Sequence, residues 1–171
     1  MRPGSPEIAL RPAQPYLGIR GTVADGGIRA FADQAFPELL GWLAQHGVAP
    51  AGPPFLRYYE VDHAGEPLDV EAGVPVEGAR TDGDGRVRAD ALPAGRYLTL
   101  LHIGPYTSDS MPDLSDAREE LLGWARDNEI FYGTETERGL ALPCALEHFR
   151  IGPVDDPDFT KWETEFAYLI G

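Results

Sequence analysis

LLGW, at residues 39–42, recurs at residues 121–124, and each copy lies in a segment whose apolar residues repeat at helical spacing. A strand-like segment precedes each copy and two strand-like segments follow it, so each half of the chain has the order β-α-β-β. A four-residue match can arise by chance, but its equivalent placement in the two halves favours an internal duplication. The sequence therefore predicts two similar units, at about residues 15–78 and 95–171.

Two such units joined edge to edge predict an α+β fold. The duplicated β-α-β-β units would form a mainly antiparallel sheet with both helices on one face. A pseudo-two-fold axis would run between the units, and grooves between half-domains are preferred ligand sites. We therefore expect a single domain over residues 15–171, with its ligand groove at this axis. The prolines among residues 1–14 favour an irregular arm ahead of the domain.

The boundaries of several elements can be predicted as well. The first helix should span about residues 28–46, with a kink or restart at Pro37. Ser110, followed three residues later by Asp113, indicates a capping box at the start of the second helix. TDGDGR, at residues 81–86, is typical of a turn. Strands are expected at FLRYYEV (55–61), DVEAGVPV (69–76), RYLTLLHIG (96–104), CALEHFRI (144–151) and ETEFAYLI (163–170).

The composition excludes several classes of partner. Lys+Arg number 14 and Asp+Glu 28, and the resulting net charge of -14 would repel a phosphate backbone, so we expect no nucleic-acid partner. No apolar run approaches the roughly 20 residues of a membrane span, and no secretory signal is visible. These features favour a cytoplasmic protein with no membrane partner. Cys144 is the only cysteine, the histidines lack metal-ligand spacing, and no glycine-rich phosphate loop occurs, so no disulfide, metal or cofactor is expected.

The order of these segments resembles the GyrI-like (DNA-gyrase-inhibitor-like) small-molecule-binding domain family. HIGPY at residues 102–106 and the glutamate-bearing ALEHFRI at 145–151 carry most of the resemblance, which extends over roughly residues 15–170. The resemblance implies a duplicated β-α-β-β fold around an aromatic pocket, with a buried glutamate that attracts lipophilic cations. The family includes effector-binding domains of multidrug-responsive transcription activators. Those carry a helix-turn-helix region ahead of the domain, for which this sequence has no room, so we expect a free-standing relative.

The family motif places the pocket glutamate at Glu147. Alternation along a strand puts Phe149 on the same face as Glu147, and Leu146 and His148 on the other. Spacing alone would also fit an ordinary solvated glutamate, whereas the resemblance favours a buried one. Glu165, on the last strand, is a second candidate acid.

Aromatic residues could line such a groove and contact a bound cation through their ring faces. Tyr58 and Tyr59 must point to opposite sides of their strand, so at most one of them faces the groove. For any single ring, packing in the core or across strands remains an alternative. The candidates on or beside strands are Tyr58, Tyr59, Tyr97, Tyr106, Phe149, Trp162 and Tyr168, with Trp124 at the groove edge.

The sequence therefore predicts reversible binding of a hydrophobic, often cationic small molecule, for drug sequestration, sensing or protection. Some relatives resemble hydrolases of cyclopropane-bearing alkylating natural products, and in that alternative Glu147 is the general base and Tyr106 a proton donor. A protein-binding inhibitor module is a third hypothesis. If FLRYY is equivalent to ALEHF, Arg57 of the first half takes the position of Glu147 in the second. The ligand and the oligomeric state stay open.

Overall fold

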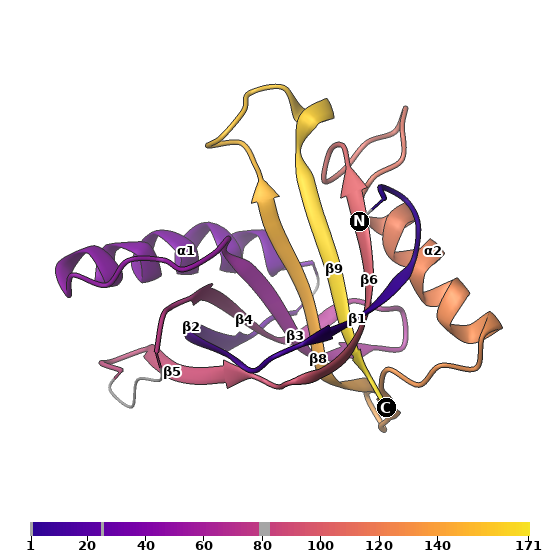
Figure 1. The fold of residues 1–171 in the computed structure, drawn as a ribbon, viewed down its shortest axis with the longest axis horizontal. Helices are drawn as coiled ribbons and strands as arrows, with labels where there is room; N and C mark the ends of the chain where they lie inside the picture. The colour runs from indigo at the N-terminus through magenta and orange to yellow at the C-terminus, as the bar shows by residue number, and fades with distance from the viewer. Residues whose placement is uncertain (1, 25, 79–82) are drawn as a thin grey trace.

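The computed structural model describes residues 2–24, 26–78 and 83–171 (Figure 1). It contains two α-helices, a short 3-10 helix and nine strands within these residues, which confirms the predicted α+β class. The helices are α1 (Ile28–Gln45), α2 (Leu114–Asp127) and η1 (Phe159–Lys161). The strands are β1 (Glu7–Arg11), β2 (Gln14–Thr22), β3 (Phe55–Asp62), β4 (Pro67–Pro75), β5 (Val87–Leu92), β6 (Gly95–Ile103), β7 (Thr134–Glu135), β8 (Gly139–Ile151) and β9 (Glu163–Ile170).

The strands form one antiparallel sheet in the order β1-β6-β9-β8-β3-β4-β2-β5, with β7 beside β8. From the central β3–β8 pair, the order outward is β3-β4-β2 on one side and β8-β9-β6 on the other. The predicted antiparallel sheet is therefore confirmed, and the five predicted strand segments all lie in strands, apart from Val76 and Gly104 at the ends of two of them. The two halves therefore place their corresponding strands in the same outward order, as two similar units would. Their origin by duplication stays a prediction.

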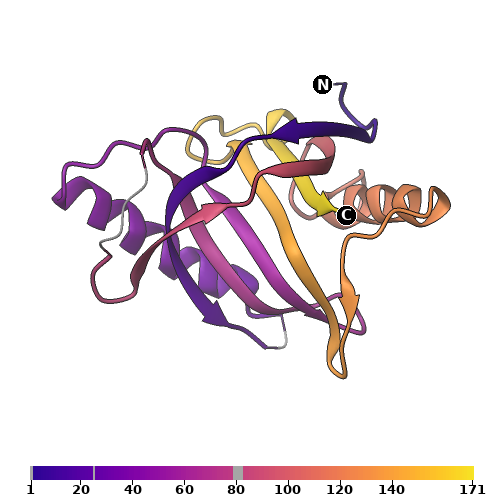
Figure 2. The ribbon, with the colours of Figure 1, turned by 60° about the horizontal axis from the view of Figure 1, so that its bottom comes forward.

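A long ladder joins the two ends of this sheet and makes it curl. β1 pairs with β6 and β2 pairs with β5 in one continuous register, from Glu7 opposite Thr99 to Gln14 opposite Leu92. Residues 7–19 and 87–99 thus run side by side across the sheet (Figure 2). The expectation of an irregular arm over residues 1–14 is wrong for residues 7–11, which form β1. Prolines stand just outside both ends of β1, where a missing N–H removes no ladder hydrogen bond.

Both helices pack on the same face of the sheet, which we call the helix face. Leu39 and Leu43 from α1 and Leu121 from α2 belong to one buried cluster with residues of the sheet. The opposite face lies inside the curl and has its own smaller core. Tyr16, Phe55, Leu92, Tyr97, Cys144, Leu146 and Ala167 form that core. Burial of apolar side chains on both faces holds the central strands in place.

Some details of the helix ends differ from the prediction. The N-cap of α2 is Asp113, whose carboxylate accepts hydrogen bonds from the backbone N–H groups of Ser115 and Asp116. The capping box is therefore one turn later than predicted, because an aspartate caps a helix at least as well as Ser110 would. α1 continues through Pro37 and ends as predicted. Of the predicted turn TDGDGR, residues 81 and 82 lie outside the described residues.

None of the helices in the described ranges is long and apolar enough to span a membrane.

Gly73→Ala is expected to lower the free energy of unfolding by about 1 to 3 kcal/mol, because overpacking strains a close-packed core. A Cβ atom at Gly73 of β4 would collide with the ring of Phe55, which lies directly across from it on β3. Urea unfolding measures the change. Gly41→Ala on α1 is the matched control: its Cβ would meet nothing within 4 Å, and alanine should raise stability by about 0.5 to 1 kcal/mol. Equal stability of Gly73→Ala and the parent protein would contradict the close packing of Phe55 against Gly73 in the core inside the curl.

Candidate functional site

Glu147 lies on the helix face of the sheet, on β8, which is one of the two central strands. Its neighbour across the β3–β8 ladder is Leu56, and only 3% of its surface is exposed. Phe149 packs against the helix-face core, whereas Leu146 belongs to the opposite core. The predicted alternation along this strand is confirmed. A carboxylate so far from water requires a charged or hydrogen-bonding partner.

Arg118 of α2 supplies that partner. Its Nη2 donates a hydrogen bond to Oε1 of Glu147 at 2.6 Å, and its Cζ lies 5.6 Å from the ring centroid of Phe166 on β9. The Arg118 side chain is 31% exposed and that of Glu147 is 3% exposed. Burial opposes the charge of Arg118, but the charge of Glu147, the nearby Tyr168 and Tyr58 and the hydrogen bond to Glu147 together outweigh burial and raise the pKa of Arg118.

Arg118 was not among the residues singled out from the sequence. A signal was present, because Leu114, Ala117 and Leu121 form the apolar stripe of α2 and Arg118 lies on the same stripe at helical spacing. A charged residue within a buried stripe usually has a buried partner. Only the fold reveals that the partner is a glutamate on β8.

Two buried tyrosines flank the Arg118–Glu147 pair. Tyr58 of β3 and Tyr168 of β9 are both part of the helix-face core. Burial and the charge of Glu147 raise the pKa of Tyr58. Burial also raises the pKa of Tyr168, against the opposing charge of Arg118. Both hydroxyl groups therefore keep their protons at neutral pH and remain available as donors.

An aromatic cluster continues the helix face next to this pair. Phe149 makes edge-to-face contacts with Phe36 of α1 and with Tyr106, at centroid separations of 6.2 and 5.7 Å. Tyr106 in turn lies 4.7 Å from the Trp162 ring. Thr164, opposite Phe149 on β9, carries a buried hydroxyl without a hydrogen-bond partner in the described residues. We call Phe36, Tyr106, Phe149 and Trp162 the aromatic wall.

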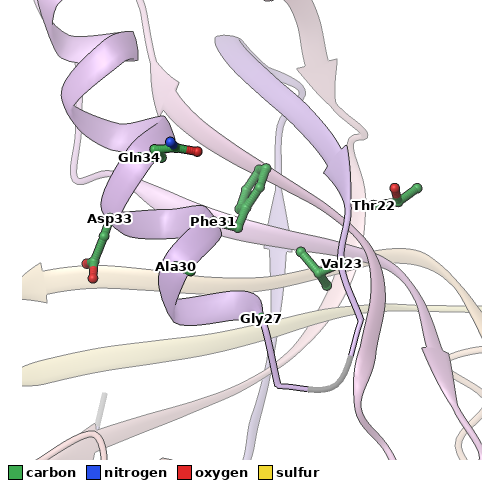
Figure 3. Close-up of a pocket in the computed structure, with 7 residues that line it drawn as sticks. All are labelled: Thr22, Val23, Gly27, Ala30, Phe31, Asp33 and Gln34. Carbon is green, nitrogen blue, oxygen red and sulfur yellow. The ribbon is translucent and has the colours of Figure 1, made fainter.

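Two surface hollows of the structure lie elsewhere. Figure 3 shows one beside the start of α1, where Phe31 forms part of the lining. A second hollow lies between the end of β6 and the start of α2. Neither is lined by Glu147. In the described part of the chain, no three His, Cys, Asp or Glu side chains are arranged to hold a metal ion.

The comparisons with known proteins agree with this architecture. A family model described as "GyrI-like small molecule binding domain" matches residues 5–158. The chain belongs to the GyrI-like family. A search of the curated proteins found no match. The recognition of this family from HIGPY and ALEHFRI is confirmed.

Solved structures of low sequence identity share the fold of this GyrI-like domain. The C-terminal domain of EcmrR superposes with a TM-score of 0.76 at 20% identity, covering 98% of this chain and 97% of that one. In an EcmrR–DNA complex the TM-score is 0.77 at 20% identity, and the match covers 97% of this chain but only 57% of EcmrR. A hydrolase from Listeria innocua has a TM-score of 0.63 at 12% identity, with 100% and 94% coverage. SAV2435, solved bound to tetraphenylphosphonium, has a TM-score of 0.59 at 15% identity, with 98% and 94% coverage.

The GyrI-like fold brings together most of the residues singled out from the sequence. Glu147, Phe149, Tyr58 and Tyr168 lie on the helix face, and Tyr106 and Trp162 adjoin it through the aromatic wall. Trp124 packs along α2 against the helix-face core, without a described contact to Glu147. Of the pair left open by the sequence, Tyr58 is the one that faces this side. The hydroxyl of Tyr59 instead donates a hydrogen bond to Glu71, away from the site.

Two of the singled-out residues lie on the opposite face. The hydroxyl of Tyr97 donates to the carbonyl oxygen of Pro93 at 2.6 Å. Glu165 accepts a hydrogen bond from Nη2 of Arg11 at 2.6 Å. The structure does not bring either residue to Glu147, because the sheet separates them.

The predicted equivalence of Arg57 and Glu147 is wrong. Arg57 points to the opposite face, where its Nη1 donates to the hydroxyl of Tyr16. Glu147 pairs with Leu56 across the ladder, and Leu56 shares its face. Matching FLRYY to ALEHF thus gave equivalent positions to residues of opposite faces, which is the error that a slip of one residue along a strand produces.

The environment of His148 should make the stability of this GyrI-like domain depend on pH. Burial lowers the pKa of His148 from 6.5 to about 4. The unfolded chain therefore takes up this proton near pH 6.5 and the folded chain only near pH 4, so stability falls as the pH drops between these values. We expect His148 to account for a loss of about 3 kcal/mol over that range. Urea unfolding at pH 7, 5 and 4 should show a correspondingly smaller loss for His148→Phe, and identical profiles would count against a neutral, buried imidazole.

Proposed function

We propose that this GyrI-like domain binds a hydrophobic, cationic small molecule on the helix face, with Glu147 as its counter-ion. The observation that carries the proposal is a carboxylate only 3% exposed beside the aromatic wall. Such a carboxylate is stable only beside a positive charge, which Arg118 provides in the free protein and a ligand cation would provide in the complex. Sequestration, sensing or protection would each follow from this one binding reaction.

The surroundings of Glu147 support a ligand of this kind. Cation–π contacts are worth about 0.5 to 2 kcal/mol each, and the aromatic wall presents several rings within one region. The unpartnered hydroxyl of Thr164 offers a hydrogen bond to a polar group on the ligand. The net charge of -14 also raises the local concentration of cations around the molecule.

SAV2435, which shares the fold, was solved bound to tetraphenylphosphonium, and this cation is a suitable probe for the present domain. Tetraphenylborate has nearly the same shape and the opposite charge. Isothermal titration in about 150 mM salt, which screens the overall charge of the protein, should give a Kd of about 10 to 100 µM for tetraphenylphosphonium and at least about tenfold weaker binding of tetraphenylborate. No binding of the cation, or equal binding of the two ions, would contradict the proposal.

A second candidate function is hydrolysis of a cyclopropane-bearing alkylating compound. It is favoured by the position of Tyr106, which contacts Phe149 on the face of the sheet that carries Glu147, at a ring-centroid separation of 5.7 Å. A water oxygen would bond to a cyclopropane carbon as the strained C–C bond breaks. Glu147 would accept the water proton, and Tyr106 would protonate the conjugated carbonyl oxygen that receives the electron pair.

Turnover distinguishes this second candidate from reversible binding. The alkylating compound is mixed in large excess with the protein, and the ring-opened product is quantified against the amount of protein. Many equivalents of product, lost in Glu147→Gln, would support hydrolysis. One equivalent or less would leave reversible binding as the function.

A further inference from the structure

The guanidinium group of Arg118 occupies the place that a ligand cation would need. It is hydrogen-bonded to the Glu147 carboxylate at 2.6 Å and lies 5.6 Å from the centroid of the Phe166 ring. A carboxylate and an aromatic ring are the two kinds of group that bind organic cations in proteins. The positive charge at this position is therefore already provided by the protein's own chain.

The two partners of this pair differ in their freedom to move. Glu147 lies on β8, between β3 and β9, and is only 3% exposed. Arg118 reaches the site from α2 at the end of a long flexible side chain that is 31% exposed. Rotation of that side chain is enough to return its charge to solvent. If the pair opens, Arg118 is the partner that moves.

We propose that Arg118 is a built-in competitor for the cation position at Glu147. In the free protein it neutralises the buried carboxylate, and a ligand cation binds by displacing the guanidinium group into solvent. When the ligand leaves, Arg118 returns, so the carboxylate is never left buried and unpaired. This inference rests on the proposed function and adds its regulation: ligands without a positive charge cannot replace Arg118, and cations bind more weakly than a bare carboxylate would allow.

Arg118→Met tests the competition directly, because methionine keeps an apolar stem against Phe166 and removes the charge. Its affinity for tetraphenylphosphonium should rise about tenfold or more over the parent protein. The affinity for neutral triphenylphosphine oxide should change by less than about threefold, since no charge is exchanged. Arg126→Met, on the solvent side of the same helix, is the matched control and should leave both affinities unchanged.

Two results would overturn the inference: the first leaves the proposed function intact, and the second contradicts the proposed function as well. One is that folded Arg118→Met binds tetraphenylphosphonium no better than the parent protein. The other is that the parent protein prefers tetraphenylborate and Arg118→Met loses that preference, which would make Arg118 an anion-binding residue. If no variant binds tetraphenylphosphonium at all, the proposed function fails, and this inference fails with it.

A measurement on the parent protein covers the case in which Arg118→Met does not fold. In a sample with 15N-labelled arginine, the Nη2–H proton of Arg118 that is hydrogen-bonded to Glu147 should exchange slowly with water in the free protein. Saturation with tetraphenylphosphonium should bring its exchange rate to that of exposed arginines such as Arg29. Unchanged slow exchange in the saturated complex would show that Arg118 stays in place.

Discussion

Glu147→Gln is expected to weaken tetraphenylphosphonium binding by about 30-fold or more. The substitution keeps the shape of the side chain and removes its charge, and loss of one partner of a buried charge pair costs about 2 to 5 kcal/mol of binding. Triphenylphosphine oxide has no charge to lose, so its affinity should fall by less than about threefold. Isothermal titration of both compounds measures the difference, and an equal loss for the two would exclude an electrostatic role for Glu147.

Glu165→Gln is the matched control for this experiment. Glu165 is also a buried acid paired with an arginine at 2.6 Å, but it lies on the opposite face of the sheet. Its substitution should leave tetraphenylphosphonium affinity within about twofold of the parent value. A loss comparable to that of Glu147→Gln would mean that the cation responds to the overall charge of the domain, and the helix face would lose its special role.

Leu121→Ala is expected to lower the free energy of unfolding by about 2 to 5 kcal/mol. Leu121 is fully buried on the apolar stripe of α2, one turn after Arg118. Truncation leaves a cavity between this helix and the sheet and removes apolar contacts that hold the helix in place. Urea unfolding of the purified variant measures the loss.

Leu40→Ala provides the matched control on the other helix. Leu40 of α1 is 45% exposed, so the same truncation should change stability by less than about 1 kcal/mol. A similar cost for the two substitutions would contradict the assignment of Leu121 to the core that holds α2 and Arg118 over Glu147.

Patterns with a fixed period could be predicted from the sequence. The alternation of Glu147 and Phe149 against Leu146 and His148 follows from the two-residue period of a strand, and the structure agrees. The apolar stripes of α1 and α2 likewise determine which side of each helix packs on the sheet. The family motif in ALEHFRI then predicted Glu147 as the pocket glutamate.

Features that depend on contacts distant in sequence could not be predicted. β1 forms because residues 87–103 provide an edge to pair with, and nothing within residues 7–11 indicates that partner. The predicted equivalence of Arg57 and Glu147 was wrong, because aligning short motifs does not determine which face a side chain takes. The Arg118–Glu147 pair joins a helix to a strand 29 positions later, and its existence depends on how α2 lies on the sheet.

The most direct test of the account is a crystal structure of the domain with tetraphenylphosphonium. We predict the cation on the helix face, with Glu147 as its nearest carboxylate, rings of the aromatic wall within about 6 Å of it, and Arg118 turned into solvent. Tetraphenylphosphonium in the hollow beside Phe31, with the Arg118–Glu147 pair intact, would contradict the account.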